Sequence, residues 1–386
     1  MKERTVIVGG GAMGSATAWF LAQLEGSGAN VVVVERDPSY QFASSSLSAS
    51  SIRQQFSTPL SIELSQFGFE FMRSCSDDGI PGSAVGLRES GYLFLGRQDQ
   101  ALALAERTRI ALERGARIRE YDRHSLAASY PWLCLDDVVY ACQGELGEGW
   151  FDGYLLQQLF RSRARRVGVE YLQGDVVDLD VKGARVAAVI LKDGSLLPAK
   201  RVVNAAGPWS ARVASMAGVD LPVRARRRTM FVVSCPTAFA GFPILIDTTG
   251  VFVRPEQNHF LCTVSPQEQI DHDDLPLDPD FTLFEETIWP TLAHRIPAFE
   301  SLRVERAWAG YYEYNTEDQN GLVGQVGPEN FFVATGFSGH GLMHSAGIGR
   351  AMAELLTYGA FRSLDLAPLS PGRLRSRELL IEDAVY

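Results

Sequence analysis

A glycine-rich turn between two apolar runs near the N-terminus constrains the fold of this chain more than any other feature. Residues 5–8 (Thr-Val-Ile-Val) have the β-branched composition and the length of a buried parallel strand. Residues 9–14 (Gly-Gly-Gly-Ala-Met-Gly) give the pattern G-x-G-x-x-G, and residues 16–24 have helix-forming composition. Residues 31–34, four valines, predict the next strand, and Glu35 closes it 21 residues after Gly14. The order strand, turn, helix, strand predicts a dinucleotide-binding βαβ unit.

Each glycine of this pattern, and the glutamate after it, has a physical task. Gly9 makes the tight turn, Gly11 lets the backbone approach a pyrophosphate, and Gly14 lets the helix pack closely on the strand. The free N–H groups at the helix start then face the phosphates. Glu35 can accept hydrogen bonds from ribose hydroxyls and would repel a 2′-phosphate. The motif alone does not separate NAD from FAD.

Composition excludes several other classes of protein. The 386 residues suffice for two or three domains, and 46% hydrophobic with 21% charged residues is typical of a globular chain. A net charge of −10 argues against a nucleic-acid partner, because phosphate binding needs clustered Lys and Arg. The five cysteines include no C-x-x-C pair, so we expect reduced thiols, no disulfide framework and no metal site.

The N-terminal run also has the outline of a secretory signal, since Lys2 and Arg4 precede the apolar residues 5–24. Four glycines interrupt that run and Glu25 follows it without a cleavage-like spacer, which favours the dinucleotide-binding interpretation. No other stretch is apolar for 18 residues, so we expect no membrane span and a cytoplasmic protein.

Three downstream regions carry further signals. Residues 43–51 form a Ser- and Ala-rich loop, which is either a flexible linker or a set of hydroxyls that bond phosphate oxygens or a planar ring. Residues 176–180, 186–191 and 196–197 predict an antiparallel meander, and residues 201–204 a strand that ends in small residues. Near the C-terminus a strand at residues 331–336, a tight loop at residues 337–341 and a helix to about Tyr358 are predicted.

Four segments together resemble the D-amino-acid oxidase and sarcosine oxidase class of FAD-dependent oxidoreductases. They are residues 8–14 with Glu35, residues 44–56, residues 203–209 (Val-Asn-Ala-Ala-Gly-Pro-Trp) and residues 336–341 (Gly-Phe-Ser-Gly-His-Gly), in family order across nearly the whole chain. Within the class, residues 308–316, 318–321 and 52–57 are most similar to the subgroup of mitochondrial FAD-dependent oxidoreductase-domain proteins involved in respiratory complex I assembly.

The resemblance implies an α/β fold with a Rossmann-like FAD-binding lobe and a β-sheet substrate lobe covered by helices. The FAD-binding domain would be discontinuous, comprising residues 1–85, 146–220 and 321–386, and the substrate domain would comprise residues 86–145 and 221–320. Short β-like runs at residues 230–234, 250–254 and 260–264, a helix around residues 284–296 and a surface helix at residues 101–114 fit this division.

The resemblance also implies the residues that would contact FAD. These are Gly9, Gly11, Ala12, Met13, Gly14, Glu35, Arg36, Ser44, Ser45, Ser51, Val176, Ala205, Ala206, Gly207, Trp209, Gly336, Ser338, Gly339, His340, Gly341, Leu342 and Met343. Covalent-flavin members of the class use a Cys in the segment aligned with residues 311–316 or a His in that aligned with residues 44–50. This chain has neither, so we expect non-covalent FAD.

The chemistry of amine oxidation points to four candidate catalytic residues. A carboxylate-bearing substrate needs a cation, and Arg53 in the flavin loop and Arg254 after a substrate-lobe strand are the candidates, although most arginines lie on surfaces. Tyr312, which shares a strand face with Tyr314, would either form part of an aromatic wall around the substrate amine or be an ordinary residue of the hydrophobic core. His340 would donate a hydrogen bond to the flavin, or be a packed loop histidine. We interpret residues 226–228, three arginines, as the crossing into the substrate sheet with alternating exposed faces.

Lysine is absent after Lys200, and sarcosine-oxidising members carry lysines near the flavin. The matching places are Met343 and residues 260–264, so sarcosine specificity and fast reaction with oxygen are not expected. The leading hypothesis is an FAD-dependent dehydrogenase of an amino acid or secondary amine that passes electrons to a quinone or flavoprotein. The alternatives are a peroxide-forming amine oxidase and a flavin-bound assembly or scaffold protein with little turnover.

Overall fold

The N-terminal βαβ unit forms from β1 (Arg4–Val8), α1 (Ala12–Leu24) and β2 (Val31–Glu35). The computed structural model describes residues 3–76, 79–266 and 276–384. β1 and β2 run parallel, with Thr5 opposite Val31 and Val8 opposite Val34. Both strands are almost entirely buried, which explains their unbroken apolar sequence. The start of α1 therefore meets the carboxyl ends of two buried parallel strands, where dinucleotides bind in such folds.

The first sheet extends this unit on both sides. Parallel strands follow one another in the order β19, β12, β1, β2 and β9, and a meander of β10 and β11 joins the sheet through β12. β18 pairs antiparallel with β19. The additional strands are β9 (Glu170–Gln173), β10 (Val176–Lys182), β11 (Arg185–Leu191), β12 (Leu196–Asn204), β18 (Leu322–Gln325) and β19 (Phe331–Thr335). The α/β fold with a Rossmann-like sheet is confirmed.

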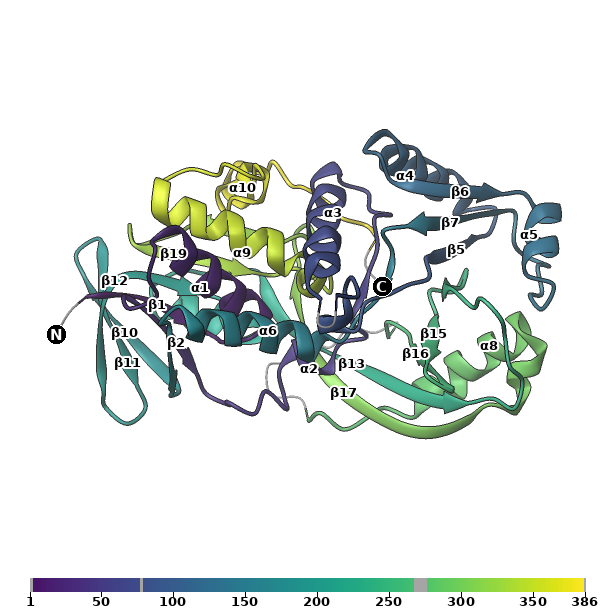
Figure 1. Ribbon diagram of the computed structural model, residues 1–386, viewed down its shortest axis with the longest axis horizontal. Helices are drawn as coiled ribbons and strands as arrows, with labels where there is room; N and C mark the ends of the chain where they lie inside the picture. The colour runs from purple at the N-terminus through teal and green to yellow at the C-terminus, as the bar shows by residue number, and fades with distance from the viewer. Residues whose placement is uncertain (1–2, 77–78, 267–275, 385–386) are drawn as a thin grey trace.

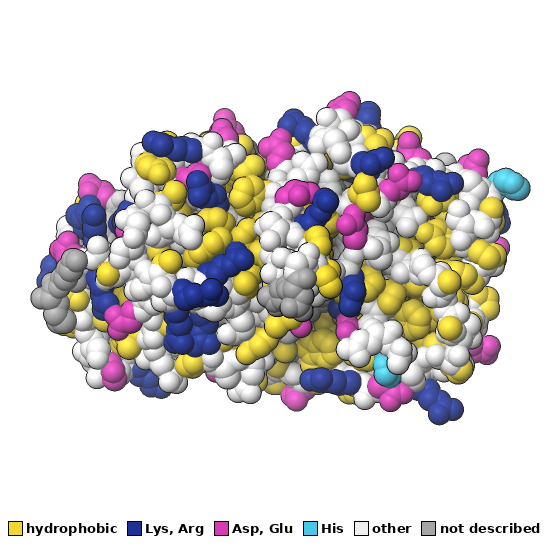
Figure 2. Space-filling model, viewed as in Figure 1, with side chains coloured by type: hydrophobic (Ala, Val, Ile, Leu, Met, Phe, Trp, Pro, Cys, Tyr) yellow, Lys and Arg dark blue, Asp and Glu magenta, His cyan; other side chains and the backbone are white. Residues whose placement is uncertain are grey.

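A helical layer covers one face of the first sheet (Figure 1). α1 packs against α6 (Gly153–Arg166) and α9 (Gly341–Tyr358), and α9 also packs against α3 (Pro59–Ser74). Trp19 of α1 contacts Phe71 of α3 and Phe160 of α6, and these two phenylalanines stack on each other at 5.2 Å between centroids. Shorter helices α7 (Ser210–Ser215) and α10 (Gly372–Ser376) complete this half. On the face seen in Figure 2, basic and acidic side chains are interspersed, apart from one group of basic side chains. The last turn of α6 carries Arg163, Arg165 and Arg166.

The second sheet lies at the other end of the long axis (Figure 1). Its strand order is β17, β13, β16, β15, β14, β5, β7 and β6, and all neighbours are antiparallel except β14 and β5. The strands are β5 (Tyr92–Gly96), β6 (Arg117–Tyr121), β7 (Tyr140–Leu146), β13 (Val223–Ser234), β14 (Ile244–Ile246), β15 (Phe252–Glu256), β16 (His259–Thr263) and β17 (Arg303–Asn315). Helices α4 (Ala101–Glu113), α5 (Arg123–Ser129) and α8 (Trp289–Arg295) belong to this half. Its apolar core includes Phe231, Phe242, Phe260 and Phe299.

The long strands β13 and β17 link the two halves. The far end of β17 reaches the loop before α9, where the backbone N–H of Asn315 donates to Ser338 Oγ at 3.0 Å and Tyr314 pairs with Phe337. A small sheet of β3 (Ser51–Ile52), β8 (Gly149–Trp150) and β4 (Arg88–Glu89) also lies at the junction. The first sheet draws on residues 4–35, 170–204 and 322–335, and the second on residues 92–146 and 223–315. The two-domain boundaries remain a prediction.

Four local expectations differ from the structure. Residues 44–47 are not loop but the short helix α2 (Ser44–Leu47). The runs at 196–197 and 201–204 form one strand, β12, which crosses at Pro198–Ala199 from the meander to β1. The helix expected at residues 284–296 begins with a π-helical turn (Phe284–Ile288) before α8, because Pro290 has no N–H to donate to the preceding turn. Arg254 lies inside β15 rather than at a strand end.

No helix in the described part of the chain combines the length and the low charge that crossing a membrane requires.

Candidate active site

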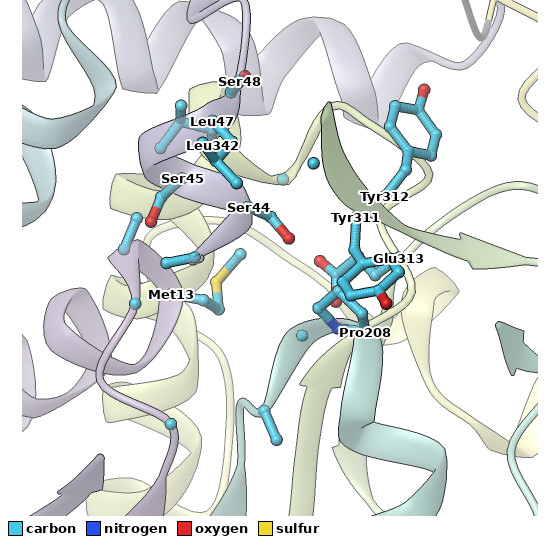
Figure 3. A pocket seen from close by; sticks show the side chains of 18 of the residues that line it. Met13, Ser44, Ser45, Leu47, Ser48, Pro208, Tyr311, Tyr312, Glu313 and Leu342 are labelled. Atoms are coloured by element: carbon cyan, nitrogen blue, oxygen red, sulfur yellow. The ribbon is translucent and has the colours of Figure 1, made fainter. Parts of the chain in front are cut away.

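A cavity of about 310 Å³ opens where the two sheets meet. The β1–α1 turn, the end of β2, α2, the segment after β12, β17 and the start of α9 all contribute to its wall (Figure 3). Most predicted cofactor contacts line it: Gly9, Gly11, Ala12, Met13, Glu35, Arg36, Ser44, Ser45, Ser51, Val176, Ala205, Ala206, Gly207, Trp209, Ser338, Gly339, Gly341, Leu342 and Met343. Gly14, Gly336 and the side chain of His340 do not line it.

The glycines of the β1–α1 turn have different surroundings. A Cβ at Gly14 would collide with the carbonyl oxygen of Gly9, so Gly14 serves the close packing of α1 on the turn. A Cβ at Gly11 would meet no protein atom nearer than Ser45 Oγ, at 3.8 Å. Because Gly11 lines the cavity and protein packing does not require a glycine there, the space beside its backbone is available to a bound group.

Glu35 is held at the end of β2 by two backbone donors. Its Oε2 accepts from the N–H of Gly10 at 2.8 Å and its Oε1 from the N–H of Asp37 at 2.9 Å. Burial raises the pKa of Glu35 above its ordinary value, although these two donors oppose the rise. Each carboxylate oxygen has a further lone pair, so the residue can still accept from ribose hydroxyls.

The serines of α2 offer hydroxyls with no protein partner. Ser44 Oγ and Ser45 Oγ are both buried and lack a hydrogen-bond partner, and both residues line the cavity. Figure 3 shows Ser44 facing Pro208 and Glu313 across the cavity. Buried hydroxyls without partners are costly, so these two indicate a polar ligand between α2 and the opposite wall.

A second helix N-terminus reaches the cavity at the start of α9. Ser338 and Gly339 precede this 18-residue helix, and Gly341, Leu342 and Met343 form its first turn on the cavity wall. The unbonded N–H groups of this turn and the helix dipole favour negative charge at that point. The N-termini of two helices, α1 and α9, therefore face the same cavity.

His340 points away from the cavity. Its ring is 2% exposed, its Nε2 lies 3.3 Å from Asn320 Oδ1, and it packs edge-on to Phe56 at 5.6 Å. Burial, with a smaller effect from Arg53, lowers the pKa of His340 to about 3. The imidazole is therefore neutral at neutral pH, and direct side-chain contact with a ligand in the cavity is not supported.

Glu313 is an acidic group of the cavity wall that the sequence did not single out. Its Oε2 accepts from Thr335 Oγ1 at 2.9 Å and from the N–H of Gly336 at 3.3 Å, and burial raises the pKa of Glu313 to about 7. On the same side, the Arg36 guanidinium lies over the Trp209 ring, 3.6 Å from its centroid. Tyr311 meets Trp209 edge-on at 5.6 Å, and Tyr312 stacks with Tyr314, which agrees with the expected alternation along β17.

The second sheet and Arg53 form the other end of the cavity, which we call the substrate end. Arg53 is 5% exposed, donates to the carbonyl of Gln55 at 2.9 Å and to that of Ala384, and lies over the Phe56 ring. Tyr312 also lies here, and its side chain contacts the backbone at Gly339. The remaining residues of the substrate end are Tyr92, Arg228, Met230, Ile246, Phe252 and Thr263.

Arg254 is placed differently from Arg53. Its guanidinium donates twice to the carbonyl of Ala49, at 3.1 and 3.2 Å, and pairs with Glu256 at 2.6 Å. Arg254 does not line the cavity. Arg254 instead joins β15 to the chain segment that follows α2. Of the four candidate catalytic residues, the structure brings Arg53 and Tyr312 together at the cavity, but not Arg254 or His340.

Sequence reasoning missed several lining residues of the substrate end, above all Arg228. The three arginines at residues 226–228 do alternate along β13, but Arg228 is 7% exposed and faces the cavity rather than solvent. Tyr92, Ile246 and Phe252 were also missed, because ordinary apolar strand residues carry no signal of a ligand. One sequence signal could have identified Arg228: side chains alternate between the two faces of β13, which places Arg228 on the same face as Tyr312 of β17.

Comparisons with known proteins agree with this geometry. The model of a family described as FAD dependent oxidoreductase (DAO) matches residues 4–355. The chain is 39% identical to FAD-dependent oxidoreductase domain-containing protein 1 of Xenopus laevis, over 99% of this chain and 84% of that protein. It is 26% identical to the mitochondrial dimethylglycine dehydrogenase of Rattus norvegicus, over 96% of this chain and 45% of that protein. Among solved structures, L-proline dehydrogenase from P. horikoshii superposes with a TM-score of 0.85 at 23% identity, covering 98% of this chain and 99% of that one.

Proposed function

Since the chain belongs to the DAO family of FAD-dependent oxidoreductases, we propose that it is a dehydrogenase that oxidises the C–N bond of an amino acid or secondary amine. The observation that carries the proposal is a cavity with two different ends. Two helix N-termini and two serine hydroxyls without protein partners lie at one end, and a buried arginine and tyrosines lie at the other. The first end suits a dinucleotide with a flavin ring, and the second suits a small carboxylate-bearing substrate.

The residues of the first end fit FAD. Gly11 leaves room for a pyrophosphate, Ser44 and Ser45 offer hydroxyls to its oxygens, and Glu35 accepts from the ribose. The described residues that line the cavity include no Cys or His, which supports non-covalent binding. When bound, FAD supplies the acceptor for a hydride from the substrate carbon that carries the nitrogen.

The residues of the second end would bind and orient the substrate. Arg53 would hold the carboxylate with its planar fork, and Tyr312 and Tyr92 would flank the amine. The N–H groups at the start of α9 form a fixed positive field that favours negative charge on the ring system beside them. Loss of the hydride from the neutral amine leaves an iminium cation. Water hydrolyses this cation to a carbonyl compound and a protonated amine, or to ammonium when the substrate is a primary amino acid.

The electron acceptor we propose is a quinone or a flavoprotein. No lysine is among the described residues that line the cavity, so the cation that assists reaction with oxygen in the resembling oxidases has no lysine counterpart there. The names of dimethylglycine dehydrogenase and L-proline dehydrogenase are consistent with an acceptor other than oxygen. A cytoplasmic location remains our prediction.

Two other functions have specific support. Glycine oxidase from Geobacillus kaustophilus shares the fold with a TM-score of 0.79 at 21% identity, which keeps a peroxide-forming oxidase as the second candidate. The similarity to FAD-dependent oxidoreductase domain-containing protein 1, a name that states no substrate, keeps a low-turnover flavoprotein with an assembly role as the third.

Anaerobic titration of the purified flavoprotein with a panel of amino acids and secondary amines tests the proposal. We expect bleaching of the flavin absorbance by at least one carboxylate-bearing amine, and turnover with a quinone analogue or dye. Peroxide formation at the rate of amine consumption would favour the oxidase. A flavin that no amine reduces would contradict both enzymatic functions and favour the assembly role.

A further inference from the structure

The chain returns after α10 to the junction of the two halves (Figure 1). Residues 378–384, which we call the returning segment, lie against the residues that follow β17 and against the start of α3. The carbonyl of Asp318, just after β17, accepts from the backbone N–H of Glu382 at 3.0 Å. Glu382 and Ala384 are both 0% exposed, whereas Asp383 between them is exposed. Alternate residues therefore pack the returning segment into the protein.

Glu382 binds the start of α3 with both oxygens of its buried carboxylate. Its Oε1 accepts from the N–H and the hydroxyl of Ser57, at 2.9 and 2.6 Å. Its Oε2 accepts from the N–H and the hydroxyl of Thr58, at 3.2 and 2.8 Å. The N–H of Ala384 also donates to Oε1, at 3.2 Å. One carboxylate therefore ties the returning segment to residues 57–58.

The same two pieces of chain contact the guanidinium of Arg53. Arg53 donates to the carbonyl of Gln55 at 2.9 Å and to that of Ala384, and its guanidinium lies over the Phe56 ring, 4.0 Å from the centroid. Residues 53–58 lie between β3 and α3, outside any helix or strand, so no regular backbone pairing fixes their path. Glu382 thus sets the relative position of the two carbonyls that orient the guanidinium.

Both pieces of chain have anchors besides Glu382. Glu148 accepts from the N–H of Gln54 at 2.7 Å and from Gln55 Nε2 at 2.9 Å. In the returning segment, the N–H of Leu380 donates to Asp318 Oδ2 at 3.0 Å. Replacement of Glu382 would leave these anchors in place and remove the tie between the two pieces. We therefore expect the orientation of Arg53 to change while the fold is kept.

We propose that Glu382 is a positioning residue, which holds the Arg53 guanidinium in the orientation that binds a substrate carboxylate. This proposal rests on the proposed function for the assignment of Arg53 to that carboxylate. Glu382 does not line the cavity, so its effect on a ligand passes through the residues that it holds. Because bidentate binding depends on the direction of the planar fork, a guanidinium that is free to turn binds a carboxylate more weakly.

The first experiment measures binding of inert acids to the purified flavoprotein by perturbation of the flavin spectrum. Acetate, propionate and butyrate are compared with their amides, which lack the carboxylate. Glu382→Gln keeps the size of the side chain and replaces an acceptor oxygen by a donor, so it should weaken binding of the best acid by about tenfold and leave amide binding unchanged. Asp383→Asn makes the same change at the exposed neighbour and should bind acids as the wild type does. Equal acid binding by wild type and Glu382→Gln would overturn the proposal, as would equal loss of acid and amide binding.

A double-mutant cycle tests whether Glu382 acts through Arg53. Arg53→Lys keeps the charge, but an ammonium group does not reproduce the planar fork that bonds to Gln55 and Ala384. In the Arg53→Lys background, Glu382→Gln should change acid binding by less than about twofold, because the orientation that it disturbs is already lost. An effect of the same size in both backgrounds would show that Glu382 acts independently of Arg53, against the proposal.

Turnover separates the proposal from the function on which it rests. With an amine substrate, Glu382→Gln should raise KM more than it lowers kcat, at the FAD content of the wild type. If no amine reduces the flavin while acids bind with the expected coupling, the proposed function fails and the positioning role stands. If amines reduce the flavin and Glu382→Gln behaves as Asp383→Asn does, the function stands and the positioning role fails.

Two further outcomes also decide. If the acids do not bind the wild type, or bind Arg53→Ala equally well, Arg53 is not the carboxylate anchor and the proposal fails. If Glu382→Gln does not fold, Ser57→Ala and Thr58→Val each remove a hydroxyl donor from the same carboxylate. These two variants should then weaken acid binding but not amide binding, and unchanged acid binding in both would overturn the proposal.

Discussion

Gly14 lies so close to the carbonyl oxygen of Gly9 that a Cβ at residue 14 would collide with that oxygen. The backbone contact between these two glycines sets how α1 meets β1, and with it the position of the helix N-terminus on the cavity. Gly11, three residues earlier than Gly14, faces open space in the cavity instead. The two positions therefore predict different consequences of substitution.

Gly11→Leu should fold but bind no FAD, whereas Gly14→Ala should destabilise the fold. A side chain at residue 11 occupies the space we assign to the pyrophosphate, while one at residue 14 forces α1 away from the turn, at a cost of about 1–3 kcal/mol or more. Urea unfolding and the flavin absorbance of the purified variants measure the two effects. A Gly11→Leu protein that keeps its full flavin content would contradict the assignment.

FAD should leave the protein on denaturation. The described cavity lining provides no Cys or His for a covalent bond, and neither residue type occurs in residues 44–50 or 311–316. After acid or detergent denaturation and filtration, the yellow colour should pass through the membrane. Colour that stays with the unfolded chain would mean that another side chain is attached to the flavin.

Arg53→Ala should weaken substrate binding more than Arg254→Ala does. Removal of a buried charged partner costs about 2–5 kcal/mol of binding, and this loss should raise KM more than it lowers kcat. Arg254 was the second candidate from sequence, but its bonds go to Ala49 and Glu256 and it does not line the cavity. We expect Arg254→Ala to lower the melting temperature. Unchanged kinetics in both variants would place the carboxylate anchor elsewhere.

The reduced flavoprotein should react slowly with oxygen. Oxygen activation needs stabilisation of a developing superoxide anion, and the oxidases that this chain resembles supply a lysine for it. No lysine lies among the described lining residues of the cavity. The test is to reduce the protein anaerobically and compare reoxidation by air-saturated buffer with that by a quinone or dye. Oxygen reoxidation faster than the dye, with stoichiometric peroxide, would favour the oxidase.

His340 should make the fold sensitive to acid. Burial lowers the pKa of His340 from 6.5 to about 3, so between these pH values the unfolded chain binds a proton that the folded chain does not. The free energy of unfolding then falls as pH drops below 6.5, by about 1 kcal/mol at pH 5.5 for this residue. Urea midpoints at pH 7.5 and 5.5 should therefore differ less in His340→Asn than in the wild type. An equal difference in both proteins would show that His340 does not contribute.

Local sequence signals predicted the βαβ unit because its physical requirements are local. The four valines of β2, the glycines of the turn and Glu35 each have a task that neighbours in the chain define, and the structure places all of them accordingly. The segment before α9 and the alternation of Tyr311 and Tyr312 were predictable for the same reason. These elements form the end of the cavity that we assign to FAD.

Only the tertiary structure determined which residues line the substrate end of the cavity. Arg228 and Arg254 both lie on strands of the second sheet, and the residues next to them in the chain do not distinguish them. Arg228 faces the cavity beside Tyr312 of β17, whereas Arg254 is bound to Ala49 and Glu256 outside the cavity lining. His340 likewise points to Asn320 and Phe56, which come from distant parts of the chain. A side chain's partner depends on which strands pair and on which elements pack above them, and those choices are made by contacts far apart in sequence.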